Sequence, residues 1–132
     1  MKRLIIIVLW AFGTALKAQT VNLTVNIKNF KNDRGSVIVT LQDPSKKGIQ
    51  EQTGKIINNV SQVIFRNLIA GKYAISLFHD ENNNKKMDAG IFKIPTEGWG
   101  VSNDAKGNFG PPKFEDMLFM IEESKAISIT IQ

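Results

Sequence analysis

A short polar segment of the chain, HDENNNKKMD, carries oxygen-bearing side chains at alternate positions. Asp80, Asn82 and Asn84 correspond to positions one, three and five of a calcium-binding loop, where alternate side chains turn toward the ion. The backbone carbonyl of Lys86 would provide the ligand of position seven, and Asp88 falls at position nine, which commonly binds through water. The spacing therefore predicts a calcium site made by these five residues.

Two parts of a calcium loop are missing from this segment. Lys85 stands at position six, where glycine makes the sharp bend, and Ile91 stands at position twelve, where a glutamate binds with both oxygens. A carboxylate from elsewhere would have to complete the site. The candidates are Glu97, Asp104, Glu115 and Asp116. The expected affinity is weak, with a Kd of about 10⁻⁴–10⁻³ M.

The alternative is a metal-free turn, since Asn and Asp bond to their own backbone and tolerate positive φ.

The same segment begins with the only histidine of the chain, His79. Histidine titrates near neutral pH, so His79 beside Asp80 could act as a general base. The alternation of the preceding residues places His79 in register with Tyr73, Ile75 and Leu77, which predicts a core or rim position. The chain has no cysteine, and no serine lies in a G-x-S-x-G setting. We therefore expect a non-catalytic binding or structural module, with a hydrolase using His79 and Asp80 as the alternative.

A stretch rich in glycine and proline follows over residues 89–116, and it contains Trp99, Phe109 and Phe114. Long connections are frequently functional or disordered, and aromatic side chains favour order. We expect an ordered loop excursion with a short strand near residues 99–102. The three aromatic residues could bind an unknown protein or carbohydrate, or they could instead plug the open end of the fold.

The elements that must position these residues alternate with period two, which is typical of strands with one buried face. About seven short strands separated by turns predict an all-β fold, an antiparallel β-sandwich. The alternation covers residues 21–28, 36–42, 63–65, 73–77, 117–121 and 127–131, with a short strand expected near 55–57.

Two connections bear on how these strands pair. The turn residues at 31–35 predict that strands 21–28 and 36–42 form a hairpin. The short glycine-containing link at 67–71 predicts either a hairpin or a tight corner between two sheets. Residues 43–54 are polar and broken by one proline and two glycines.

The N-terminus has the layout of a secretory signal. Two basic residues precede an apolar run that is too short to span a bilayer, and small and polar residues follow it. We expect residues 1–18 to be a signal peptide cleaved after Ala18 or Gln19, and residues 19–132 to form a single β-sandwich domain. The alternative is an uncleaved N-terminal anchor. The pattern indicates an exported protein, periplasmic or extracellular, and the lack of cysteine favours a bacterial source.

The charge balance depends on the predicted signal peptide. The whole chain has 17 basic and 12 acidic residues and a net charge of +5, but the signal holds three basic residues and no acidic one. The mature chain would therefore have 14 basic and 12 acidic residues, a net charge of +2. A domain with a nearly balanced charge and no basic cluster lacks the positively charged surface that nucleic acid binds. No segment of the mature chain is predicted to span a membrane.

Three segments of the chain, FRNLIAGKYAISLFHDENNNKKMD, GIFKIPTEGWGVSND and GPPKFEDMLF, resemble the bacterial family called domain of unknown function 2141. The resemblance covers nearly the whole mature chain. It implies an exported domain with an immunoglobulin-like or transthyretin-like sandwich, and it implies no activity. Similar members usually have glycine where this chain has Lys85. The segment at 67–73 is also similar to sandwich modules of the carboxypeptidase-regulatory type, which serve mostly as accessory domains.

Overall fold

A computed structural model of the chain describes residues 13–14, 19–87 and 96–132. Within these ranges the chain forms eight strands and two very short helices. The strands are β1 (Thr20–Lys28), β2 (Ser36–Gln42), β3 (Gly48–Lys55), β4 (Val60–Ile69), β5 (Gly71–Asp80), β6 (Trp99–Val101), β7 (Phe119–Ile121) and β8 (Lys125–Thr130). The helices are η1, a 3₁₀ turn at Ser102–Asp104, and α1 at Phe114–Met117. Among the described residues, no helix is long and apolar enough to cross a membrane.

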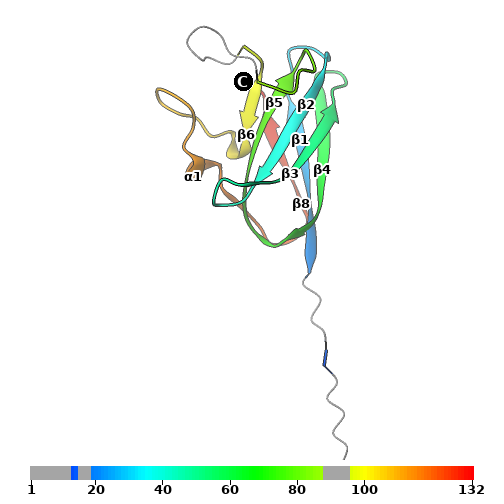
Figure 1. The fold of residues 1–132 in the computed structure, drawn as a ribbon, viewed down its shortest axis with the longest axis vertical. Coiled ribbons are helices and arrows are strands. Elements are labelled where there is room, and N and C mark those ends of the chain that lie inside the picture. Colours follow the sequence, from blue (N-terminus) through cyan, green and yellow to red (C-terminus); the bar gives the residue numbers. More distant parts are fainter. Residues whose placement is uncertain (1–12, 15–18, 88–95) are drawn as a thin grey trace, which may run out of the picture.

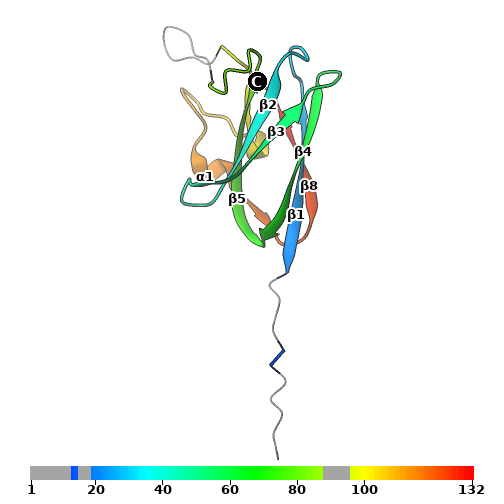
Figure 2. The ribbon, with the colours of Figure 1, turned by 45° about the vertical axis from the view of Figure 1, so that its right-hand side comes forward.

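The strands form two sheets that pack face to face (Figures 1 and 2). One sheet has the order β4-β1-β8, and the other has the order β3-β2-β5. The far edge of β5 pairs with β6 at residues 76–78 and with β7 at residues 71–73. The predicted β-sandwich is confirmed, with eight strands in the described residues where about seven were expected. The predicted antiparallel arrangement is wrong at one pair, since β8 runs parallel to β1. The chain reaches β8 from β7, which pairs with β5 of the other sheet.

The alternation found in the sequence becomes the core between the sheets. The inward-facing residues of the long strands are almost completely buried. Burial stabilises the fold by about 1.5–3 kcal/mol for each large aliphatic or aromatic side chain. The most buried of these residues include Leu23, Val25, Ile27, Val37, Val39, Leu41, Phe65, Ile75, Leu77 and Ile129.

The predicted hairpin between residues 21–28 and 36–42 is wrong, because β1 and β2 lie in different sheets. β1 pairs with β4 and β8, whereas β2 pairs with β3 and β5. Alternation indicates which face of a strand is buried, and this face is the same whether the next strand lies beside it or opposite it. The connecting loop therefore crosses from one sheet to the other, and its Phe30 is buried in the core.

The short strand predicted near residues 55–57 is displaced, because the structure places β3 at Gly48–Lys55. The sequence of β3 is polar because the strand lies at the edge of its sheet and is mostly exposed. The position that faces the core is Gly54, where a Cβ atom would lie 2.9 Å from methyl groups of Val37 and Val63. An edge strand with a glycine at its buried position shows no apolar alternation.

The link between β4 and β5 is a corner between the two sheets, which decides between the alternatives for residues 67–71. The hydroxyl of Tyr73 in β5 donates a 2.5 Å hydrogen bond to the backbone carbonyl of Ile69 in β4. Tyr73 is itself buried in the core, so this bond ties the corner to the sandwich. Burial also raises the pKa of the Tyr73 hydroxyl above its ordinary value.

The structure describes the loop excursion from residue 96 onward. This part of the excursion packs on the outer face of the sheet that contains β5, and β6 is the short strand predicted near residues 99–102. A second apolar cluster forms there from Ala74, Val101, Ala105 and Met117. The buried hydroxyl of Ser102 accepts the N–H of Ile75 at 2.9 Å and donates to the carbonyl of Met117. This side chain therefore occupies the gap that the β5 edge leaves between β6 and β7.

The last residues of the chain join the two sheets at the end opposite the start of β1 (Figure 1). The N–H of Ile131 donates to the carbonyl of Lys28 at 3.0 Å, which continues the pairing with β1. Gln132 then exchanges two backbone hydrogen bonds with Trp99 of β6, at 2.8 and 3.4 Å. The close approach depends on Gly100, where a Cβ atom would lie 2.9 Å from a methyl group of Ile129.

We predict that Tyr73→Phe destabilises the protein by about 0.5–1.5 kcal/mol at neutral pH, because the partly buried hydrogen bond to the Ile69 carbonyl is lost. The raised pKa means that this tyrosine adds stability fully below its unfolded pKa of about 10, and that the stability is lost as pH rises through the folded pKa. The difference in free energy of unfolding between wild type and variant should therefore shrink above pH 10. Urea unfolding from pH 7 to 11 measures it, and a difference that grows with pH would contradict the assignment.

Candidate functional site

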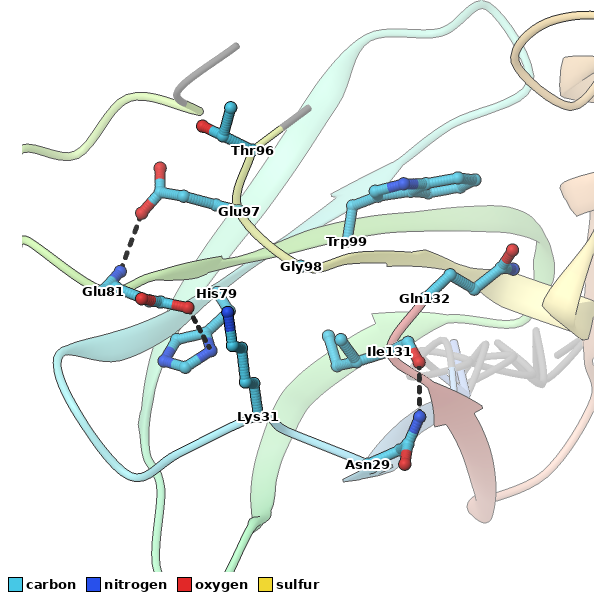
Figure 3. A pocket seen from close by; sticks show the side chains of 10 residues that line it. All are labelled: Asn29, Lys31, His79, Glu81, Thr96, Glu97, Gly98, Trp99, Ile131 and Gln132. Atoms are coloured by element: carbon cyan, nitrogen blue, oxygen red, sulfur yellow. Dashed lines mark hydrogen bonds and ion pairs between the residues drawn. The ribbon is translucent and has the colours of Figure 1, made fainter. Parts of the chain in front are cut away.

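Four separate segments meet at the end of the sandwich that holds the C-terminal residues (Figure 3). They are the loop after β1, the end of β5, the start of β6 with the residues before it, and the last two residues of the chain. Together they surround a pocket of about 350 Å³. Its lining consists of Asn29, Lys31, His79, Glu81, Thr96, Glu97, Gly98, Trp99, Ile131 and Gln132.

His79 forms the floor of this pocket and is buried, with 1% of its surface exposed. Its Nε2 atom lies 2.6 Å from the backbone carbonyl of Arg34, and a carbonyl can only accept, so Nε2 carries a proton. Its ring packs edge to face on Phe30 with the ring centres 5.2 Å apart. Its Nδ1 atom lies 3.9 Å from a carboxylate oxygen of Glu81. The predicted core position of the histidine is confirmed, and its nearest carboxylate is Glu81 rather than Asp80.

Asp80 is equally buried but lies on the opposite face of β5, as successive strand residues must. Its Oδ1 atom accepts the N–H of Asn84 at 3.1 Å, and its Oδ2 atom accepts the N–H of Lys85 at 2.9 Å. The two residues proposed for a hydrolase thus have different partners: His79 holds the loop after β1, and Asp80 holds the loop after β5.

The loop after β5 is shaped by the same polar side chains that suggested calcium. The Oδ1 atom of Asn82 accepts the N–H of Asn84 at 3.2 Å, and that of Asn84 accepts the N–H of Lys86 at 2.9 Å. Lys85 has a φ of 61°, which is the left-handed conformation that glycine adopts most easily. The bend expected at position six is therefore present although the glycine is not. Asp88, the last predicted ligand, lies outside the described residues.

Of the four carboxylates considered for completing the calcium site, Glu97 is the one that lies against this loop. Its Oε2 atom accepts the N–H of Glu81 at 2.8 Å, and the residue is 7% exposed. Asp104 instead accepts the N–H of Thr130 at 2.8 Å, while Glu115 and Asp116 lie in α1. Within residues 19–87 and 96–132, no group of three or more His, Asp or Glu side chains is placed to hold a metal ion.

The three aromatic residues singled out in the sequence have different positions. Trp99 lines the pocket, and both Trp99 and Phe114 pack against the second apolar cluster. The ring of Phe114 also has the ammonium of Lys46 5.5 Å from its centre. Phe109 is fully exposed and belongs to neither group. The structure therefore brings two of the three together, and of these Trp99 faces the pocket.

Sequence reasoning missed most of the polar residues of the pocket. Asn29 and Lys31 follow β1, and Gln132 ends the chain, so no local pattern connects them with His79. The Nδ2 atom of Asn29 donates to the carbonyl of Ile131 at 2.9 Å, which joins two of the four segments. The position of Glu81 could have been inferred, because it lies two residues after His79 and continues the same face of the strand.

We predict that Asp80→Asn destabilises the protein by about 1–3 kcal/mol in buffer containing EDTA, because one of the two partly buried N–H bonds to the carboxylate is replaced by an unfavourable contact with an amide N–H₂. Asn82→Ala removes a bond in the exposed part of the loop and should cost less than about 1 kcal/mol. Urea unfolding of both variants beside wild type measures these costs. Equal stability of Asp80→Asn and wild type would show that the carboxylate does not hold the loop.

One comparison with known proteins finds a relationship. Residues 25–129 match the model of a bacterial family described as "Uncharacterized protein conserved in bacteria (DUF2141)". No curated protein and no solved structure matches the chain. The matched range runs from within β1 to within β8 and includes the loop after β1, the end of β5 and the start of β6. The chain therefore belongs to the DUF2141 family, as its three motif segments predicted.

Proposed function

We propose that this protein is an exported, non-catalytic module that binds a small ligand in the pocket around Trp99. The observation that carries the proposal is the composition of this pocket. It combines one indole with polar side chains delivered by four chain segments, and ligand sites are commonly concave and built in this way. Its volume of about 350 Å³ also falls in the range of small-molecule sites.

Catalysis receives little support from the residues that could perform it. A histidine acting as general base needs a ring nitrogen within reach of the substrate. The Nε2 atom of His79 already donates to the Arg34 carbonyl, and the ring is buried below Glu81. The carboxylate of Asp80 accepts two backbone N–H groups of its own loop. The other ring nitrogen of His79, Nδ1, keeps its lone pair, but it lies 3.9 Å from the Glu81 carboxylate in a side chain that is 1% exposed, so little of it is open to a substrate. Export, in turn, is supported by the charged and apolar layout of residues 1–18.

The proposal is tested by NMR on ¹⁵N-labelled protein with a panel of saccharides, short peptides and amino acids. We expect at least one class to shift the amide signals of residues 29–31, 79–81 and 96–99 without being consumed. The intact mass of the purified protein checks export, because signal cleavage removes residues 1–18. A panel that leaves these signals unchanged, or a ligand that is hydrolysed, would contradict the proposed function.

A calcium-stabilised loop is a second candidate, favoured by two observations. Lys85 adopts the left-handed bend of position six, and Glu97 reaches the loop from the excursion. Calcium prefers oxygen ligands, and the side chains of Asp80, Asn82 and Asn84 supply them at alternate positions of this loop. In this proposal the ion would fix the loop at the edge of the pocket and would not react.

We predict that 5 mM CaCl₂ raises the melting temperature of the protein relative to EDTA. With a Kd near 0.5 mM the added stability is about 1.4 kcal/mol, which corresponds to roughly 4–7 °C. Glu97→Gln is the matched variant, because its amide oxygen can still accept the Glu81 N–H while the negative charge is lost.

This variant should melt near wild type in EDTA and show a smaller calcium shift. MgCl₂ at 5 mM controls for ionic strength. Identical wild-type melts in calcium and EDTA would identify the loop as a metal-free turn.

A further inference from the structure

We infer that the ligand of the Trp99 pocket is a carbohydrate, with one sugar ring lying against the indole. This inference rests on the proposed function and names the ligand class of the same pocket. Another concave surface of about 690 Å³ lies beside β1 and β4, but its lining contains no aromatic side chain. The pocket at Trp99 therefore offers the better site for a ligand with a flat apolar face.

Trp99 is fixed in place before any ligand binds. Its backbone exchanges two hydrogen bonds with Gln132, and its side chain packs against the apolar cluster that contains Val101 and Met117. The same side chain is partly exposed and lines the pocket. Figure 3 shows the indole above Gln132 and Ile131, beside Gly98. An aromatic ring held on one side and open on the other is a rigid platform, so binding costs little side-chain entropy.

The polar groups around the platform suit hydroxyl groups. Within the described residues, the side chains of Lys31, Thr96 and Gln132 make no hydrogen bond or ion pair, so they are available to a ligand. Lys31 can only donate, the Glu81 carboxylate can only accept, and the hydroxyl and amide groups do both. A sugar hydroxyl also donates and accepts, so it can satisfy each of these groups, while the C–H face of the ring covers the indole.

A protein partner fits this surface less well. Protein interfaces have a desolvated apolar centre with a polar rim. The pocket lining has Trp99 and Ile131 as its large apolar side chains, and Ile131 is buried with 5% of its surface exposed. Phe109, the most exposed aromatic residue among those described, is not part of the lining.

The test uses the fluorescence of Trp99. The chain contains two tryptophans, Trp10 and Trp99, so a Trp10→Phe background makes Trp99 the single reporter whether or not the signal is removed. The probes are soluble malto-, cello-, xylo- and chito-oligosaccharides of two to four units, with a mixture of tripeptides as the second arm. We expect a saturable change of Trp99 emission with at least one saccharide and none with the peptides.

Three variants locate the binding. Lys31→Ala and Gln132→Ala remove exposed side chains that carry no structural bond in the described residues, and each should weaken binding about five-fold. Phe109→Ala, which removes an exposed aromatic ring outside the pocket, should leave the affinity unchanged. Thermal melts of all variants confirm that the fold is retained.

The outcomes separate this inference from the proposed function. Emission changes with peptides alone would overturn the carbohydrate assignment and leave the binding function standing. Saccharide binding that Lys31→Ala and Gln132→Ala do not weaken would place the site elsewhere and overturn the inference. No change with either class would overturn the carbohydrate assignment, and the NMR panel, which also contains amino acids, then shows whether the binding function fails as well.

Discussion

The crossing of the C-terminal residues from one sheet to the other is the constraint on which the rest of the structure depends. Ile131 continues the pairing with β1, and Gln132 pairs with Trp99 of β6 one residue later. This is sterically feasible because Gly98 and Gly100 face the crossing chain, where a side chain would collide with Ile131 and Ile129. The crossing closes the sandwich at that edge, and it also sets Trp99 beside the loop after β1. The pocket is a consequence of this closure.

The end of β5 supports the pocket in two directions at once. His79 faces inward and holds the loop after β1 through the Arg34 carbonyl, while Asp80 faces outward and gathers the N–H groups of the loop that follows. Both side chains are buried and polar, and each makes at least one hydrogen bond to the backbone, as burial requires. One strand end thereby determines the position of two loops, and Glu81 between them contributes a carboxylate to the pocket wall.

The excursion adds the third wall through contacts on the outside of the sheet. Ser102 replaces a missing ladder bond on β5, and the cluster around Met117 anchors the same segment by apolar burial. The Ser102 hydroxyl both accepts and donates a hydrogen bond, and the cluster is small and apolar. Together they hold the excursion, which has few strand residues of its own. Trp99 and Glu97 are therefore presented from a fixed backbone, which is what a binding site needs if the ligand is small.

Period-two alternation in the sequence was sufficient to determine that the fold is a β-sandwich, which residues form its core, and that His79 belongs to that core. The Asn- and Asp-rich segment likewise determined a turn, because those side chains bond to the nearby backbone. Tertiary structure alone decided that β1 and β2 lie in opposite sheets, that the polar stretch at Gly48–Lys55 is an edge strand, and that Asn29, Lys31, Glu97 and Gln132 meet around Trp99. The physical reason is range: alternation and turn chemistry act between residues close in the chain, whereas pairing of distant strands and the meeting of four separate segments depend on packing that no local pattern encodes.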